Sequence, residues 1–277
     1  MSFKDLLVHV SVSGHCRQRL EISARLARTF GAHLTGFYTN PAGDVPFFTM
    51  EEISTDMQAS IRAWSLQLRD RTKAAFENCV RDLGVDGEWA ETTADAGVAV
   101  PYRARFFDLA VVGQVDPEEL LPRAERDLPE RVALESGRPV LVVPYAGNFP
   151  IVGRRVMVAW NASPQAVRAI NDALPFLTRA EKVVLLTINP GSRSGHGGFA
   201  DAGIVRHLAR HGVEAQVKEM VAEDIAVDEM ILSRGSDEEA DLIVMGAYGH
   251  ARTREVVLGG TTRHLFQHMT VPVLMSH

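Results

Sequence analysis

The sequence is poor in cysteine and carries no excess of positive charge. Two cysteines, Cys16 and Cys79, among 277 residues are too few for a disulfide framework or a four-cysteine zinc site. A formal net charge of −6 disfavours a general nucleic-acid or membrane-surface binder, because phosphate groups attract basic surfaces. No stretch approaches the roughly 20 uncharged apolar residues of a membrane-spanning helix, and the N-terminus lacks a signal-peptide pattern. We therefore expect a cytoplasmic protein with no nucleic-acid or membrane partner.

Aromatic residues are also scarce, at 7% of the chain, so the core must be built mainly from Val, Leu, Ile, Ala and Met. Hydrophobic residues make up 46% and charged residues 23%, which is an ordinary globular composition. The length suits two domains of average size.

The chain repeats itself. Residues 6–13 resemble 156–163, Asn40-Pro41 matches Asn189-Pro190, and two further matches pair 108–114 with 241–247 and 139–145 with 272–277. The offset is 149 or 150 residues for the first two pairs and 133 for the last two. The sequence therefore predicts two copies of one domain, residues 1–147 and 152–277, with about 16 extra residues in the first copy around 44–58.

Each copy alternates short apolar runs with longer amphipathic ones. In the second copy, the predicted strands are 156–160, 183–188, 214–220, 241–246 and 272–276. The predicted helices are 163–177, 199–212, 228–240 and 261–269. Strands that are apolar throughout and separated by helices are typical of a parallel sheet covered on both faces. The predicted fold class is thus α/β, with two tandem, doubly wound, parallel five-stranded sheets that bind ligands beyond the carboxyl ends of their strands.

A run of glycines follows the fourth predicted strand of the second copy. It contains Gly246, Gly249, Gly259 and Gly260, and it leads into a predicted helix that begins near Thr261 and Thr262. Glycines let a backbone approach phosphate groups closely, and amides at a helix start point at the anion. The segment indicates a phosphate or other anion site, and the alternative is a long structural turn that needs glycines for positive φ.

The spacing Gly-x2-Gly-x9-Gly, followed by hydroxyl residues and a Pro-Val-Leu strand, resembles the nucleotide-binding signature of the universal stress protein family. Gly246, Gly249 and Gly259 match its three glycines, and Thr262 matches a later hydroxyl position. The resemblance covers the chain as two tandem domains and is strongest over 241–275. It implies a Rossmann-like, adenine nucleotide alpha hydrolase-like fold with strand order 3-2-1-4-5 that binds ATP.

The resemblance also assigns individual contacts. The position that faces the ribose in ATP-binding members is acidic and corresponds to Asn161, an amide without charge. The adenine position maps to about Ile188, and Gly260 stands where the family has Ser or Thr.

The first copy departs from this pattern. No second or third glycine follows Gly113, and several acidic residues there would repel a phosphate: Asp116, Glu118, Glu119 and Glu125. Ser11 or Ser13 occupies the acidic position of the first strand. We expect a degenerate copy that forms an intramolecular pseudo-dimer with the second copy through their final strands, and a homodimer remains open.

Three functions fit these features. The preferred one is a stress-response regulatory protein that binds ATP or another adenine nucleotide in the second copy, with no catalytic residue assigned. One alternative is a weak ATP-hydrolysing enzyme that uses Mg²⁺ near Asp224 or Asp228. The other is an interaction module that binds no nucleotide, which Asn161 and Gly260 favour.

Other signals are weaker. The histidine pairs His207/His211 and His264/His268 have helical spacing, but surface or capping roles are favoured over metal binding. Cys16 is interpreted as a small packing residue. The glycine motif at 195–200 follows the second strand, which is the wrong place for a dinucleotide fingerprint. The apolar residues of the first-copy insertion predict a helix on its own domain, or else a lid or dimer contact: Phe47, Phe48, Met50, Ile53 and Met57.

Overall fold

The computed structural model describes residues 2–40, 55–119, 125–189, 199–223, 225–247 and 260–277. The chain divides into two compact units, one formed by Phe3–Arg138 and the other containing Pro139–His277. The predicted segment of glycines at 195–198 and the insertion residues Phe47, Phe48, Met50 and Ile53 lie outside the described residues.

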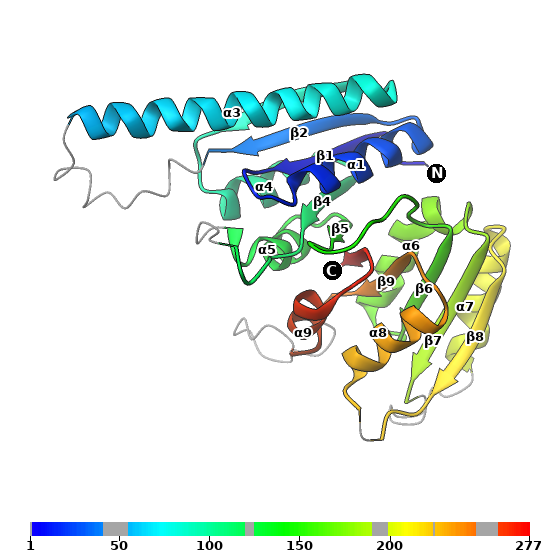
Figure 1. The fold of residues 1–277 in the computed structure, drawn as a ribbon. Helices are drawn as coiled ribbons and strands as arrows, with labels where there is room; N and C mark the ends of the chain where they lie inside the picture. The colour runs from blue at the N-terminus through cyan, green and yellow to red at the C-terminus, as the bar shows by residue number, and fades with distance from the viewer. Residues whose placement is uncertain (1, 41–54, 120–124, 190–198, 224, 248–259) are drawn as a thin grey trace. The chain divides into compact units, whose positions relative to one another are not determined.

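The N-terminal unit is a parallel sheet with the strand order β3-β2-β1-β4 (Figure 1). Its elements, in chain order, are β1 (Asp5–Val10), α1 (Cys16–Phe30), β2 (His33–Thr39), α3 (Thr55–Leu83), β3 (Gly87–Thr92), α4 (Ala96–Ala104), β4 (Leu109–Gly113) and α5 (Leu128–Glu135). The central strand β1 is buried from Leu6 onward, because it lies between two neighbours in the sheet, and His9 is its one polar residue after Asp5.

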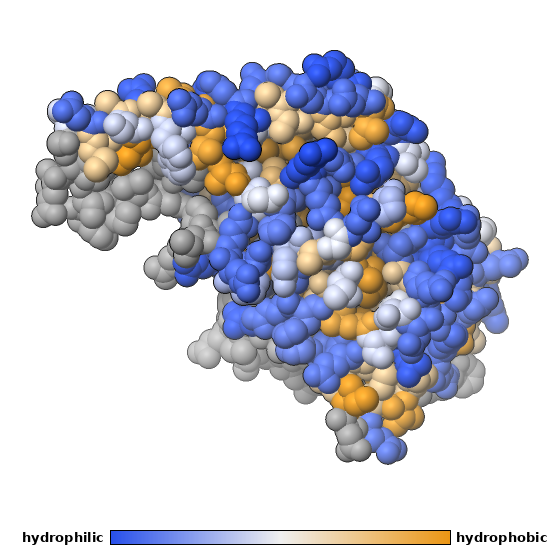
Figure 2. Space-filling model, in the orientation of Figure 1, coloured by the Kyte–Doolittle hydropathy of each residue, from blue (hydrophilic) through white to orange (hydrophobic). Residues whose placement is uncertain are grey.

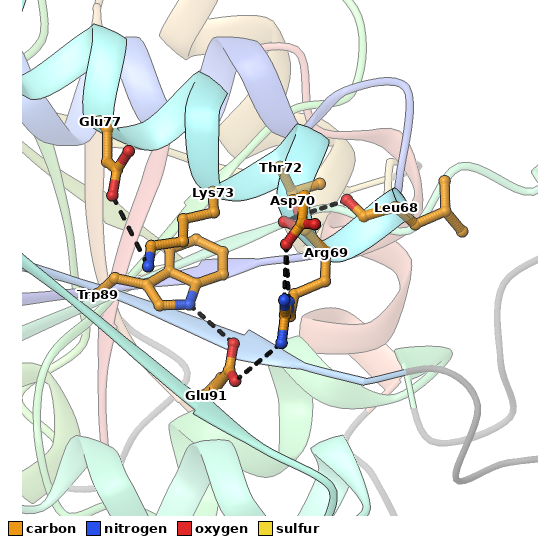
Figure 3. A network of polar contacts seen from close by, with 8 residues as sticks. All are labelled: Leu68, Arg69, Asp70, Thr72, Lys73, Glu77, Trp89 and Glu91. Atoms are coloured by element: carbon orange, nitrogen blue, oxygen red, sulfur yellow. Dashed lines mark hydrogen bonds and ion pairs between the residues drawn. The ribbon is translucent and has the colours of Figure 1, made fainter. Parts of the chain in front are cut away.

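Helix α3 docks on the N-terminal sheet through a few specific contacts. The ring of Phe76 lies over Gly36 of β2, where a methyl group would come within 2.7 Å of the ring. Phe76 also contacts Trp89 of β3. The indole N–H of Trp89 donates to Glu91 (Figure 3). Arg69 of α3 completes this network with an ion pair to Glu91, so the helix is held from Arg69 to Phe76.

The C-terminal unit is a larger sheet with the strand order β5-β10-β9-β6-β7-β8. Its elements are β5 (Val140–Val143), β6 (Arg155–Trp160), α6 (Pro164–Leu177), β7 (Lys182–Ile188), α7 (Phe199–Arg210), β8 (Ala215–Met220), α8 (Val227–Asp237), β9 (Leu242–Gly246), α9 (Gly260–His268) and β10 (Val273–Ser276). Strands β6 to β10 are parallel, with α6 and α7 on one face and α8 and α9 on the other (Figure 1). The α/β class is confirmed, and these five strands have the predicted order 3-2-1-4-5.

Strand β5 ends the first sequence copy and is grouped with the C-terminal unit, where Val142 pairs antiparallel with Val273 of β10. This pairing agrees with the expectation that the two copies meet through their final strands. Pairing satisfies the backbone of both strands, which would otherwise present open sheet edges. The predicted boundaries at residues 147 and 152 stay a prediction.

The repeated Asp-Leu pair has a shared structural role. The Asp108 carboxylate accepts a hydrogen bond from the Lys4 backbone N–H at 2.7 Å, just before β1. Asp241 accepts one from the Gly153 N–H at 2.7 Å, just before β6. In both copies the aspartate that precedes the fourth strand thus fixes the start of the first strand.

The core consists mainly of Val, Leu, Ala, Ile and Met, as the scarcity of aromatic residues predicts. Over the ranges that the structure describes, no helix is long and apolar enough to cross a membrane.

Candidate functional site

The candidate site lies at the carboxyl edge of the C-terminal sheet, between β6 and β9. These two strands are neighbours, with Ala159 beside Met245 near their ends. From β6 the chain proceeds to β7 and β8 on one side, and then returns to β9 and β10 on the other. This reversal of strand order is where open α/β sheets bind ligands.

A short loop from β6 fixes the start of α6 at this edge. The Asn161 side-chain oxygen accepts a hydrogen bond from the Ser163 N–H at 3.0 Å. The Ser163 hydroxyl accepts one from the Ala166 N–H at 3.2 Å, which is the predicted N-cap, and Pro164 occupies the first turn. Asn161 is exposed, at the edge where the family resemblance places a ribose.

Gly246 ends β9 in direct contact with the first turn of α6. A methyl group on Gly246 would lie 2.5 Å from the Ala166 nitrogen and from the Gln165 carbonyl carbon, both of them backbone atoms. The glycine is therefore required by close helix-to-strand packing. From the sequence, the same glycine was expected to let a phosphate approach the backbone, and that expectation stays a prediction.

The start of α9 belongs to the same edge. A helix that connects two parallel strands runs against them, so its N-terminus lies at the carboxyl edge, where its first amides carry partial positive charge. Gly260 and Thr261 form the first positions of α9, and Thr262 is buried, with 3% of its surface exposed. Gly249 and Gly259 lie outside the described residues.

The predicted adenine position lies at the end of β7, one strand away from β6. Ile188 is half-buried there and pairs with Met220 of β8. The next residue, Asn189, accepts a hydrogen bond from the Ala222 N–H at 2.8 Å, which joins the ends of β7 and β8. An apolar side chain on a fixed strand end suits contact with a planar base.

The predicted histidine pair of α9 connects two helices. His264 forms an ion pair with Asp228 of α8, and its ring stacks on His268 at a centroid distance of 4.0 Å. Asp228, which the hydrolase alternative places near Mg²⁺, is 5% exposed and faces His264. Asp224 lies outside the described residues, among which no group of three or more His, Cys, Asp or Glu side chains is arranged to hold a metal ion.

The corresponding edge of the N-terminal unit is filled by its own side chains. Glu119 accepts hydrogen bonds from the Ser13 hydroxyl at 2.7 Å and from the Gly14 N–H at 2.9 Å. His15 pairs with Asp116 at 2.9 Å. Carboxylates of the loop after β4 thus bind the loop before α1 and take the place that an external anion would need.

A buried arginine closes the crevice between β1 and β4. Arg19 of α1 is 4% exposed and donates to the His9 carbonyl oxygen at 2.7 Å and to the Ser11 hydroxyl at 3.0 Å. Its guanidinium lies against Gly113, where a methyl group would come within 2.2 Å of it. Burial, together with the charge of Arg19, lowers the pKa of His9. Neither the buried position of Arg19 nor the role of Glu119 was predicted from the sequence. An arginine on the apolar face of its helix is a signal that could have indicated a buried charge.

Replacing Glu119 by alanine is expected to lower the free energy of unfolding by about 1 kcal/mol, because two donors lose their acceptor in a half-exposed place. Glu118→Ala is the matched control, since only its backbone N–H contacts Asp116. Urea denaturation measures both variants. Equal stability of the two variants would show that the Glu119 contact contributes nothing.

Residues 153–277 match the sequence profile of the Universal stress protein family. A universal stress protein of Synechocystis is 34% identical over 67 residues, which are 24% of this chain and 22% of that relative. The chain therefore matches less than a quarter of that relative's length.

Two solved structures share the fold over nearly the whole chain. A universal stress protein from Archaeoglobus fulgidus covers 98% of this chain and 95% of its own length, with a TM-score of 0.76 and 15% identity. A functionally unknown protein from Pseudomonas aeruginosa covers 99% of this chain and 92% of its own length, with a TM-score of 0.59 and 14% identity.

The C-terminal unit is a doubly wound α/β domain. Its candidate site lies where the strand order reverses, which is where domains of this class bind ligands. The match to the Universal stress protein family lies in the C-terminal unit, over residues 153–277.

Proposed function

We propose that the C-terminal unit binds an adenine nucleotide, ATP with Mg²⁺ on its phosphates, at the carboxyl edge of β6 and β9, and that the protein is regulatory. The observation that carries this proposal is the backbone contact between Gly246 and the first turn of α6. It brings the N-terminus of α6 to the end of β9, on the edge where α9 also begins. Helix N-termini at one edge favour an anion such as a triphosphate.

Each predicted residue has a role in this proposal. Asn161 faces the ribose, Ile188 the adenine, and the segment from Gly246 to Thr262 the phosphates. Gly249 and Gly259 enter through the sequence motif alone. Because Thr262 is buried, it and Thr261 serve the phosphates through their backbone N–H groups at the start of α9.

The N-terminal unit is proposed as a non-binding copy, because Glu119 and Arg19 fill its edge. The two copies form the proposed pseudo-dimer by way of the β5–β10 pairing. Nucleotide then shifts a conformation or a partner interface in a stress response. A reducing cytoplasm is the proposed location, since both cysteines are free thiols, Cys16 buried and Cys79 half-buried.

Asn161→Asp is expected to tighten ATP binding about 10-fold, because a carboxylate accepts from ribose hydroxyls more strongly than an amide does. Asn171→Asp is the matched control, an equal chemical change at an exposed position of α6 whose amide donates to the Val167 carbonyl oxygen. Titration calorimetry compares the two variants with the wild type. An equal change in ATP affinity in both variants would mean that the added negative charge acts without a specific contact to the ribose.

The hydrolase alternative is tested by phosphate release from ATP and Mg²⁺. If the protein is regulatory, we expect saturable ATP binding and phosphate release that is no faster than in a Gly249→Val control. Release that is abolished by Gly249→Val would establish the enzyme instead. Absence of binding in a folded protein would favour the interaction module.

A further inference from the structure

Helix α4 and the turn after it expose three large apolar side chains. Val98 and Tyr102 of α4 are each 59% exposed, and Phe106, which follows the helix, is 62% exposed. A helix that connects two parallel strands runs against them, so α4 ends at the amino edge of the N-terminal sheet, opposite the edge that Glu119 fills. The three side chains therefore form a surface separate from the carboxyl edge of this sheet.

These side chains make one stripe. A spacing of four residues places Val98 and Tyr102 on the same face of α4. The rings of Tyr102 and Phe106 meet edge to face, with 5.7 Å between their centroids. On the face of the molecule seen in Figure 2, apolar surface is divided into small areas by hydrophilic side chains. A stripe that joins an aliphatic side chain to two aromatic rings is typical of a protein contact.

Two arginines lie beside the aromatic end of the stripe. The Arg105 guanidinium lies over the Tyr102 ring, 5.6 Å from its centroid, and donates to the Glu135 carbonyl oxygen at 3.1 Å. The Arg138 guanidinium donates to the Arg105 carbonyl oxygen at 3.0 Å. These contacts hold both positive charges next to the stripe. The stripe and the two arginines together make up the α4 patch, which consists of Val98, Tyr102, Phe106, Arg105 and Arg138.

The charge of the α4 patch is not balanced by a neighbouring acid. Within the described part of the chain, neither Arg105 nor Arg138 forms an ion pair. The Glu135 carboxylate pairs with Arg131 at 3.2 Å. The Asp108 carboxylate accepts hydrogen bonds from backbone N–H groups at the start of β1. Two positive charges therefore remain at the patch, on a chain whose net charge is −6.

These features fit a partner that is both acidic and apolar. Planar guanidinium groups suit carboxylates, which they bind through two parallel hydrogen bonds, and the stripe suits apolar side chains. Asp95 stands at the start of α4, beyond Val98. The carboxylates of the partner therefore belong at the Phe106 end of the patch.

A peptide fits the patch better than a nucleic acid does. The Tyr102 ring already contacts Arg105 and Phe106, so little of it is left for a base to stack on. A long polyanion is also repelled by a chain of net charge −6, whereas a short acidic segment carries few charges.

We propose that the α4 patch binds an acidic, amphipathic peptide segment of a partner protein. The apolar side chains of that segment pack on the stripe, and its carboxylates pair with Arg105 and Arg138. Five residues make a smaller contact than a standard interface, so the binding is weak and falls with added salt. The proposal does not rest on nucleotide binding, and its test needs no nucleotide.

A model peptide tests the chemistry of the partner. The probe is a fluorescently labelled helical peptide of leucine and glutamate, and its counterpart has lysine in place of each glutamate. Fluorescence anisotropy with the full-length chain is expected to show that the acidic peptide binds at least about 10-fold more tightly than the basic one. Equal affinities, no binding of the acidic peptide, or its displacement by a single-stranded oligothymidylate would overturn the proposal.

Two variants test the place of binding. Arg105→Glu is expected to weaken binding of the acidic peptide about 10-fold or more through reversed charge, and Phe106→Ala about 10-fold through lost apolar contact. The matched controls are Arg71→Glu and Trp64→Ala, which change exposed residues of α3 and are expected to leave the affinity unchanged. Thermal unfolding checks that each variant is folded. Wild-type affinity in either patch variant, or an equal loss in its control, contradicts the proposal.

A second copy of the chain is the other candidate for this surface. Sedimentation at the concentrations of the peptide assay is expected to show no association that depends on Phe106. Self-association that disappears in Phe106→Ala would mean that the patch contacts another copy, and the assignment to an acidic peptide would then be wrong.

Discussion

Gly246→Ala is expected to lower the free energy of unfolding by about 1 to 3 kcal/mol and to remove measurable ATP binding. The added methyl would lie 2.5 Å from two backbone atoms of Gln165 and Ala166, and backbone yields less readily than a flexible side chain. Either β9 or the first turn of α6 must move. Both belong to the proposed site, so stability and affinity fall together.

Gly203→Ala provides the control for this prediction. Gly203 lies within α7, and a methyl group there would meet nothing within 4 Å. Because alanine favours a helix over glycine, a gain of up to about 1 kcal/mol is expected, with ATP affinity unchanged. Thermal unfolding and calorimetry measure both variants. Wild-type stability in Gly246→Ala would mean that the contact with α6 is not close in solution.

Asp241→Ala is expected to cost about 2 kcal/mol while leaving ATP affinity unchanged. The Asp241 carboxylate accepts from the backbone N–H groups of Gly153, Arg154 and Arg155, at 2.7, 2.9 and 3.1 Å. These groups precede β6 at the amino edge of the sheet, far along the strand from Asn161. Removing the acceptor leaves the start of the central strand unsatisfied.

The control is Asp237→Ala, which removes a carboxylate that is 52% exposed and paired with Arg234. Such a surface pair contributes less than about 1 kcal/mol. Urea unfolding at neutral pH separates the two variants. If Asp241→Ala lost ATP binding at full stability, the amino edge and the nucleotide site would be coupled, contrary to expectation.

Much of the fold was predictable, because its signals are local. The apolar runs at 156–160 and 183–188 became β6 and β7 with shifts of one residue. Ser163 and Pro164 marked the start of α6. The repeat revealed Asp108 and Asp241, although only the structure shows that both bind the backbone before the first strand.

The parts that were missed depend on contacts distant in sequence. A contact between the two final strands was expected, but nothing local to the PVLVV segment indicates the register in which Val142 of β5 pairs with Val273 of β10. Helix α3 has 29 residues, whereas the corresponding helix α7 has 12. The change in repeat offset located the extra residues of the first copy but did not predict that α3 would be the longer helix. Apolar periodicity in α3 also does not tell which face of the helix packs on the sheet, which the structure shows to be the face that carries Phe76.

For the candidate site, the sequence predicted which residue types take part, but not the backbone contacts and hydrogen bonds among them. The glycine spacing predicted that a phosphate approaches Gly246, which stays a prediction, whereas the contact of Gly246 with the first turn of α6 was not predicted. In the first copy, acidic residues predicted the repulsion of a phosphate. The hydrogen bonds from Ser13 and Gly14 to Glu119 make that carboxylate an internal occupant, which charge counting does not reveal.

Titration calorimetry of the folded full-length chain with ATP and Mg²⁺ tests the central claim most directly. The account predicts saturable binding of one ATP per chain, since one copy carries the glycine motif and the other is filled by its own side chains. Unchanged heats up to millimolar ATP, or a stoichiometry of two per chain, would contradict it.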